Sequence, residues 1–202
     1  MVTITENRPP GHPRSEDVDQ AILDATLDLL IDSGIPGVSI EKVAHRAGVS
    51  RPTVYRRYPN RTELLLAAIA ASRPIADTDL PEPTDVKQML SWWARSLAGD
   101  TDTRQRQLLR RMTTSLHDFP DLREAYTKAS IEPRTRWIRA VLEQERARGH
   151  FPADTDLTVV QRILSDAAAS HLLTQPDDST AQEIEDYLLA VLMETRYRQH
   201  DS

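Results

Sequence analysis

The sequence predicts an all-α protein of about nine helices arranged in two parts. Apolar residues recur at helical spacing along most of the chain, and no stretch alternates apolar and polar residues as a half-buried strand does. Glycine accounts for only 6 of the 202 residues, less than half the usual share of roughly 7%. Because sandwiches and barrels use glycine in their turns, an all-β fold is disfavoured.

Helix start and stop signals predict a first domain over residues 15–73, preceded by a disordered, proline-rich tail over 1–14. A serine followed by two acids at residue 15 caps a helix and faces its positive dipole end. Capping serines open the next two helices, and Asn60 with Glu63 resembles a capping box for the fourth. The helices expected in this domain are 15–33, 39–47, 50–58 and 64–72.

Proline and acidic residues predict a linker over 74–84, and the helical period then returns in a second domain, 85–202. Pro133 should kink or split the helix that contains it. The helices expected here are 85–99, 104–117, 121–148, 156–174 and 180–198.

The composition excludes several kinds of site and location. The absence of cysteine excludes disulfides, thiolate nucleophiles and cysteine-ligated zinc. The longest apolar run, Leu64–Ala71, is far shorter than the roughly 18 residues of a membrane span, and the first residues lack the apolar segment of a signal peptide. We therefore expect a cytoplasmic protein without a membrane partner. A net charge of −6 and a pI near 5.5, taken alone, argue against binding to nucleic acid.

The charge is distributed unevenly, however. Residues 39–58 have the layout of a helix-turn-helix, with two short helices joined by a tight turn at Gly48 and Val49. From Lys42 to Arg61 there are six cations and no acid, so a local +6 is set on a remainder of −12. A cation cluster is ordinarily only a solvated face. Its coincidence with caps, a turn and core spacing here favours a surface that binds DNA.

Between Ile22 and Leu65 a series of residues occurs in a specific order: Ala25, Leu29, Leu30, Gly34, Val43, Ala44, Ala47, Gly48, Val49, Ser50, Thr53, Val54, Tyr55, Tyr58, Asn60, Arg61, Glu63 and Leu64. This series resembles the TetR family of bacterial transcription regulators over about a quarter of the chain. Arg61 stands where lysine is usual, Pro52 where glycine is frequent, and Tyr58 where phenylalanine is usual.

The resemblance implies DNA-facing roles that the residue chemistry supports. Arg51 and Thr53 are the expected base readers, whereas Tyr55 and the following arginines are expected to contact phosphates. The two capping serines also expose helix amino termini to a phosphate oxygen. Core packing is an equal alternative for Tyr55, and Lys42 has the alternative of merely solvating its helix. The full DNA-binding set is Ser39, Lys42, Ser50, Arg51, Pro52, Thr53, Tyr55, Arg56, Arg57 and Arg61.

In the family, the second domain binds a small molecule, and the segment 133–149 is similar to one common carboxy-terminal type. Adjacent residues on a helix point about 100° apart, so Trp92 and Trp93 cannot both face one core. Ordinary core packing is the alternative for every candidate, and the favoured one for His171. The residues expected to line a pocket are Met89, Trp92, Trp93, Leu97, Met112, Leu116, Phe119, Tyr126, Trp137 and His171.

Wide apolar faces on the last two helices predict a homodimer contact, as the resemblance also implies. A two-fold contact of this kind sets the spacing of two half-sites on DNA. The residues expected in the dimer interface are Val160, Ile163, Leu164, Ala167, Ala168, Leu172, Ile184, Leu188, Val191 and Leu192.

The sequence thus predicts a homodimeric transcriptional regulator, a repressor that a small apolar effector releases from a palindromic operator in double-stranded DNA. The resemblance implies that release occurs by displacement of the helix that follows Arg61. A transcriptional activator is one alternative, and a cytosolic small-molecule-binding protein or enzyme with idle DNA-binding helices is another. An enzyme is disfavoured because the histidines are scattered and no phosphate loop, nucleophile elbow or zinc motif is present. No metal and no cofactor are expected.

Overall fold

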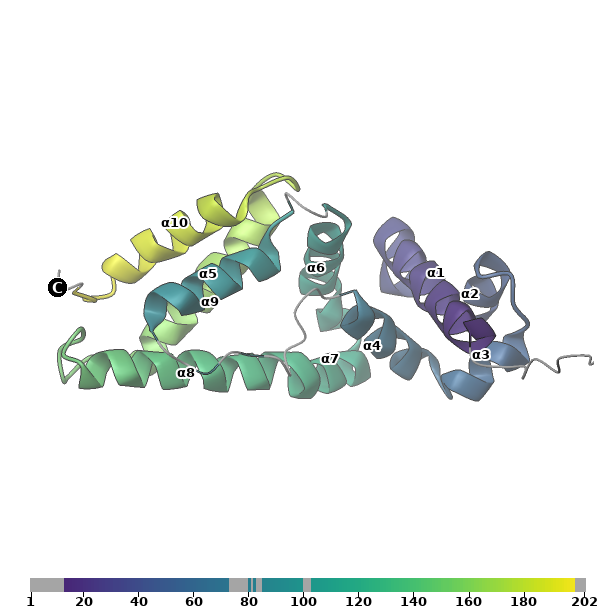
Figure 1. Cartoon of the computed structure of the whole chain (residues 1–202), viewed down its shortest axis with the longest axis horizontal. Helices are drawn as coiled ribbons and strands as arrows, with labels where there is room; N and C mark the ends of the chain where they lie inside the picture. Colours follow the sequence, from purple (N-terminus) through teal and green to yellow (C-terminus); the bar gives the residue numbers. More distant parts are fainter. Residues whose placement is uncertain (1–12, 73–79, 81, 83–84, 100–102, 199–202) are drawn as a thin grey trace, which may run out of the picture. The chain divides into compact units, whose positions relative to one another are not determined.

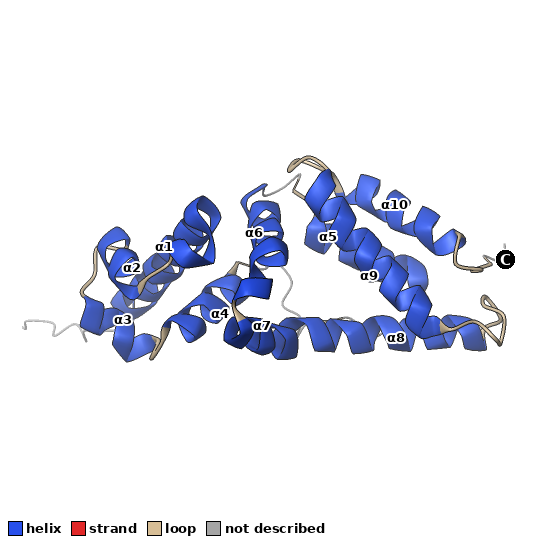
Figure 2. Cartoon of the chain, turned by 180° about the vertical axis from the view of Figure 1, so that it is seen from behind, coloured by secondary structure: helices blue, strands red, loops and turns tan. Residues whose placement is uncertain are grey.

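The computed structural model describes residues 13–72, 80, 82, 85–99 and 103–198 (Figure 1). All regular secondary structure in these ranges is helical, as Figure 2 shows, which confirms the all-α class. The chain divides into two compact units, Met1–Ala68 and Ile69–Ser202. The predicted tail over 1–14 and linker over 74–84 lie almost wholly outside the described residues. Among the helices that are described, none is long and apolar enough to cross a membrane.

The helices of the first unit are α1 (Pro13–Gly37), α2 (Ile40–Arg46), α3 (Arg51–Arg57) and α4 (Arg61–Ala71), the last of which ends in the second unit. Gly34 interrupts α1 with φ 67°, a conformation that glycine adopts without strain, at the helix end that the sequence predicted. Helix α4 begins three residues earlier than predicted. The Asn60 side chain accepts from the Glu63 amide and donates to its carboxylate, both at 2.9 Å, so the helix starts directly after Asn60.

One apolar core holds the first unit together, and it is drawn from all four helices. Helix α2 contacts both α1 and α3. The side chains that are almost completely buried include Ile22, Leu30, Ile35, Val43, Val54, Leu64 and Leu65. Because Val54 is the one buried residue of α3, the remaining faces of this short helix are available for other contacts.

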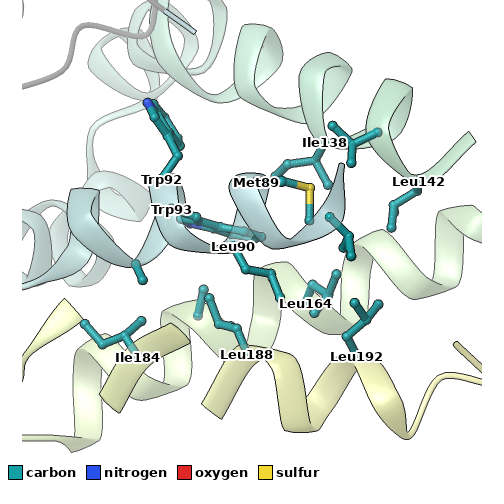
Figure 3. Close-up of a cluster of buried hydrophobic side chains, with 14 of the residues drawn as sticks. Met89, Leu90, Trp92, Trp93, Ile138, Leu142, Leu164, Ile184, Leu188 and Leu192 are labelled. Carbon is teal, nitrogen blue, oxygen red and sulfur yellow. The ribbon is translucent and has the colours of Figure 1, made fainter. Parts of the chain in front are cut away.

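The helices of the second unit are α5 (Val86–Leu97), α6 (Thr103–Ser115), α7 (Pro120–Tyr126), α8 (Glu132–Ala147), α9 (Leu157–Thr174) and α10 (Ala181–Met193). Helix α5 packs against α8 and α10, and α9 contacts α6, α8 and α10. Figure 3 shows Met89 of α5 beside Ile138 of α8, with Leu188 and Leu192 of α10 on the other side of α5. Helix α5 is therefore the central helix of this core, with α8 and α10 packed against it.

The helix predicted over 121–148 is divided. A π-helical turn, Thr127–Ile131, separates α7 from α8, and Pro133 lies in the first turn of α8. Proline has no N–H, so it cannot donate to the carbonyl of the preceding turn, and the chain accommodates it with a wider turn in which the Glu132 amide donates to the Thr127 carbonyl. The predicted helix 180–198 also ends early, at Met193, because Arg196 turns with φ 70°.

Side-chain caps begin three helices of the second unit close to their predicted starts. Asp85 accepts from the Gln88 amide at 2.8 Å, and Thr180 forms a reciprocal capping box with Glu183. Asp156 accepts from the amides of Thr158 and Val159, and these donors lower the pKa of its carboxyl group. Asp156 therefore acts as a helix cap, whereas the nearby Asp154 pairs with Arg196, and no group of three possible metal ligands occurs among the described residues.

Arg106 of α6 is completely buried. Its guanidinium donates to the carbonyls of Leu97 at 2.7 Å, Pro176 at 2.9 Å and His171 at 3.1 Å, and to Nδ1 of His171 at 3.3 Å. Burial lowers the pKa of Arg106, but an arginine stays charged at neutral pH. The charge is satisfied by the carboxyl-terminal carbonyls of α5 and α9, where the helix dipoles are negative.

We predict that Arg106→Met destabilises the second unit by about 3 kcal/mol or more, because it removes the charged donor from three carbonyls, two of them in buried hydrogen bonds. Urea unfolding followed by tryptophan fluorescence measures this effect, since all three tryptophans lie in that unit. Arg110→Met is the matched control. Arg110 donates to the carbonyls of Leu172 and Gln175 near the end of α9 but is half exposed. Its loss should therefore lower the free energy of unfolding by about 1 kcal/mol or less. Equal effects of the two substitutions would contradict the role given to Arg106.

Candidate DNA-binding surface and ligand cavity

A tight turn joins α2 to α3. Gly48 has φ 67°, and the amides of Gly48 and Val49 donate to the carbonyls of His45 and Ala44 at 3.3 and 3.0 Å. This is the pattern of a Schellman motif, which ends a helix on a glycine in the left-handed conformation. Ser50 follows immediately and caps α3 by accepting from the Thr53 amide at 3.3 Å. The turn therefore fixes where α3 begins and how it leaves α2.

Helix α3 presents one face to solvent. Val54 is 0% exposed and anchors the helix, whereas Tyr55 is 53% exposed. Arg51, Pro52 and Arg56 are also exposed. The core-packing alternative for Tyr55 is therefore wrong, and its ring is free to contact another molecule. A short helix anchored on one side and exposed on the other fits the major groove of DNA.

The six cations of the basic block are not equivalent, because acids outside the block pair with several of them. Arg46 binds Asp28 and Asp32 at 3.5 and 3.1 Å. The exposed side chain of Arg51 forms an ion pair with Glu41. Within the part of the chain that the structure describes, Lys42 and Arg56 are exposed and have no ion-pair partner.

Two arginines expected to contact phosphates also bond other groups within the unit. The Nε of Arg57 donates to Asp19 of α1, and its side chain is only 16% exposed. Arg61 donates to the Ile35 carbonyl, which lies just beyond the break in α1. Both side chains tie the end of α3 and the start of α4 to α1. Chain spacing could not show this, since the partners lie 38 and 26 residues away.

The capping serines and Thr53 occupy the amino-terminal ends of the two short helices. Ser39 accepts from the Lys42 amide at 3.2 Å, and the hydroxyls of Ser50 and Thr53 are 2.8 Å apart. Ser50 is exposed, and Ser39 and Thr53 are half-buried. The local hydrogen bonds orient these hydroxyl groups at the start of each helix.

The second unit contains a cavity of about 430 Å³, a volume within the range of roughly 300–1,000 Å³ that small-molecule sites occupy. Five of the residues expected in a pocket line it, namely Trp93, Leu97, Met112, Leu116 and Tyr126. The other lining residues are Leu109, Thr113, His117, Arg123, Thr127, Ile131, Arg134, Thr135, Ile138, Ser165, Ala168, Ala169 and Leu172.

The other five pocket candidates lie elsewhere. Trp92 packs on Trp137 with ring centroids 5.1 Å apart, and of the two adjacent tryptophans only Trp93 lines the cavity. The expectation that they cannot both face one core is wrong, because both are at most 5% exposed and belong to the same apolar core. Met89 is buried in the core, and Phe119 precedes α7. His171 is buried beside Arg106 and 5.2 Å from the Tyr187 ring. Burial and the adjacent guanidinium lower the pKa of His171. This is the core role favoured for it.

The polar part of the cavity was missed by sequence reasoning, which looked for apolar residues. It includes Arg123 of α7 and Arg134 of α8. Neither arginine has an acid three or four residues away, the spacing at which a helical ion pair forms. That pattern was readable in the sequence, although Arg95 and Arg110 share it without lining the cavity.

Most residues expected in the dimer interface are core residues of the subunit. Helical periodicity cannot tell an apolar face turned to the core from one turned to a partner. Ala167 and Val191 are half-buried, and Ile163 is 41% exposed beside Val159 at 52%. Buried at 4% exposure or less are Val160, Leu164, Ala168, Leu172, Ile184, Leu188 and Leu192.

Two family models match the chain. One, described as bacterial regulatory proteins of the tetR family, covers residues 22–68. The other, a tetracyclin repressor-like C-terminal domain, covers residues 80–191, more than half of the chain. The chain therefore belongs to the TetR family, and it is a DNA-binding transcriptional regulator of the helix-turn-helix type. This is a family of regulators and not of enzymes.

Individual relatives agree along nearly the whole length. The chain is 24% identical to an uncharacterised regulator, YdeS of Bacillus subtilis, over 89% of this chain and 90% of that one. It is 27% identical to the DNA-binding transcriptional repressor TetR of Mycobacteroides abscessus, over 89% and 96%. The crystal structure of NalD, the secondary repressor of the MexAB-OprM multidrug efflux pump in Pseudomonas aeruginosa, has a TM-score of 0.75 at 18% identity, over 93% of this chain and 100% of that one.

We predict that Arg56→Ala weakens binding to random-sequence duplex DNA and lowers the slope of log affinity against log salt by about 1, because one phosphate contact is lost. Gel-shift titrations at several salt concentrations measure both quantities. Arg57→Ala is the matched control. Its loss of the Asp19 contact should reduce the free energy of unfolding by about 1 kcal/mol while changing the salt slope less than Arg56→Ala does. The reverse order would show that Arg57 is the phosphate contact.

Proposed function

We propose that this regulator is a homodimeric repressor that binds a palindromic operator and leaves it when a small molecule fills the cavity of the second unit. In this proposal residues 15–73 bind DNA, 74–84 form the linker, and 85–202 bind the effector and dimerise. The observation that carries the proposal is the exposure of α3, which is anchored by Val54 and turns Arg51, Tyr55 and Arg56 outward.

Arg51 is the residue that we assign to base reading. It lies in the first turn of α3 and is exposed, and its fork of donors matches the two acceptors of guanine. Its present partner, Glu41, is also well exposed, so the ion pair is weak and can exchange for a base. Thr53 is the second expected reader, through its methyl group or hydroxyl. Tyr55, Arg56 and Lys42 contact the backbone on either side.

Repression is supported by two similar proteins that are described as repressors, those of Mycobacteroides abscessus and Pseudomonas aeruginosa. Release by an effector is supported by the cavity, which lies wholly within the second unit. Helix α4 links the two functions, because it begins directly after the DNA-binding helices and ends in the second unit. A shift of α4 would move α1 through the bond from Arg61 to the Ile35 carbonyl, and α1 is joined to α3 by the ion pair between Asp19 and Arg57. Release requires the effector to bind the non-DNA form more tightly, typically by about 1–3 kcal/mol.

The dimer surface in this proposal is the outward face of α9 and α10. It carries large apolar side chains that are at least 37% exposed, namely Val159, Ile163, Leu173, Tyr187 and Met193. Exposed apolar residues gathered on two adjacent helices mark an interaction surface. Ile163, Ala167 and Val191 remain from the interface expected from the sequence, and the buried members are replaced by these exposed ones.

We expect the purified protein to bind a palindromic site tightly, and Arg51→Ala to lose about 1–3 kcal/mol of affinity for that site while losing little for random DNA. Sites selected from a random duplex pool and the upstream region of its own operon provide the test by gel shift. Glu41→Gln, which releases the Arg51 side chain, is the control and should not weaken binding. Failure to select any preferred sequence would count against the regulator having a specific operator.

A charge on the proposed dimer surface should separate the subunits. Ile163→Asp is expected to give a monomer in sedimentation experiments and to lose affinity for the full palindrome, because two half-sites are then no longer bound together. Gln88→Asp adds the same charge at an exposed position on α5 and should remain dimeric. If Ile163→Asp stays dimeric, the contact lies on another surface.

A further inference from the structure

We propose that the cavity of the second unit binds an amphipathic carboxylate, an apolar molecule that carries one anionic head. This inference rests on the proposed function, since it specifies the chemistry of the effector. Two observations carry the inference. Two arginines in the cavity lining have no counter-ion among the described residues, and none of the lining residues is an acid.

The apolar part of the cavity is made by side chains from several helices. Trp93 and Leu97 come from α5, Met112 from α6, and Ala168 and Leu172 from α9. The lining exposes more apolar than polar surface to the cavity. A molecule that occupies this space must therefore be largely hydrocarbon, because its contacts replace water on apolar walls.

The charged part of the lining is of one sign. Arg123 and Arg134 line the cavity together with His117, and none of the 18 lining residues is Asp or Glu. The chain as a whole has 31 acids in 202 residues, so a lining of average composition would contain about three of them. A cavity that excludes acids inside an acidic protein favours an anion and disfavours a cation.

The two arginines are also unpaired. Among the described residues neither Arg123 nor Arg134 has a hydrogen-bond or ion-pair partner for its side chain. Other arginines of α8 differ, because Arg136 pairs with Glu132 and Arg139 with Glu143. An unpaired guanidinium beside an apolar cavity retains donors arranged to bind a carboxylate through two parallel hydrogen bonds.

Three consecutive segments bring these groups to the cavity. His117 belongs to the 3₁₀ turn Leu116–Asp118, Arg123 to α7, and Arg134 to the first turn of α8. Thr127 and Thr135 add hydroxyl groups from the π-helical turn and from α8. The other polar lining residues are Thr113 of α6, which is exposed, and Ser165 of α9, which is half-buried. The apolar lining residues of α5, α6 and α9 would contact the hydrocarbon part of the ligand.

Aromatic rings provide the one argument for a cationic ligand. Trp93 and Tyr126 line the cavity, and a quaternary ammonium can bind over such rings. Two guanidinium groups in the same lining repel that cation, and no carboxylate is present to offset them. The observations therefore favour the carboxylate, and the ammonium compound becomes an outcome of the test.

The first experiment compares head groups on one tail with the purified full-length protein. Octanoate, decanoate and dodecanoate are titrated below their micellar concentrations, beside the alcohol and the trimethylammonium compound of each tail. Calorimetry reports binding, and so does tryptophan fluorescence, because Trp93 lines the cavity. We expect a carboxylate to bind about 10-fold or more tightly than its matched alcohol, and the ammonium compound to bind most weakly.

The second experiment changes the arginines. Arg123→Gln and Arg134→Gln should each weaken carboxylate binding by about 10-fold and leave the alcohol unchanged. Arg134→Glu should reverse the preference toward the ammonium compound. Arg146→Gln is the matched control, because Arg146 is a further α8 arginine without a described partner but lies outside the cavity lining. Its affinity for the carboxylate should not change.

The outcomes separate this inference from the proposed function. Equal or tighter binding of the alcohols or ammonium compounds, or no binding of any carboxylate, overturns the inference. Loss of carboxylate affinity in Arg146→Gln equal to that in Arg134→Gln overturns it as well. If the carboxylate binds as expected but does not release operator DNA in a gel shift, the inference stands and the proposed function fails. If a neutral or cationic compound alone releases the DNA, the proposed function stands and the inference fails.

Discussion

The packing of the second unit depends on one buried charge, the guanidinium of Arg106. It bonds the last carbonyls of α5 and α9 and the connection that follows α9, so the carboxyl ends of two helices meet at a single side chain. The carboxyl ends of two helices, both partly negative, would repel each other, and the shared guanidinium offsets this repulsion by attracting both. Because α5 and α9 also supply residues of the cavity lining, Arg106 supports two walls of the cavity without lining it.

In the DNA-binding unit, the charge counted along the chain differs from the charge that the surface presents. Asp19, Asp28 and Asp32 of α1 and Glu41 of α2 each pair with an arginine of the basic block. The pair of Asp19 with the half-buried Arg57 holds α1 against α3, so part of the basic block serves the fold of the unit. The remaining exposed cations are few, and their position on α3 and beside it matters more than their number.

Sequence patterns predicted well what short-range physics decides. Caps at Ser39, Ser50 and Asn60, the glycine ends of helices, and the burial of Val54 all depend on neighbours within one or two turns. Contacts between residues far apart in the chain, such as the bond from Arg57 to Asp19, could not be predicted from local patterns. For the same reason only the apolar part of the cavity lining was predicted. Core residues of α9 and α10 were assigned to a dimer contact because periodicity does not show whether an apolar face packs against the core or against a partner.

The π-helical turn Thr127–Ile131 has an evolutionary consequence. A π turn holds one more residue than an α turn, and it arises when a single residue is inserted into a helix. Deleting one residue here would rotate every later side chain of α8 by about 100° relative to α7. Thr127, Ile131 and Arg134 would then meet the cavity differently. A change of one codon at this turn could thus alter which effector a relative senses, without altering the fold.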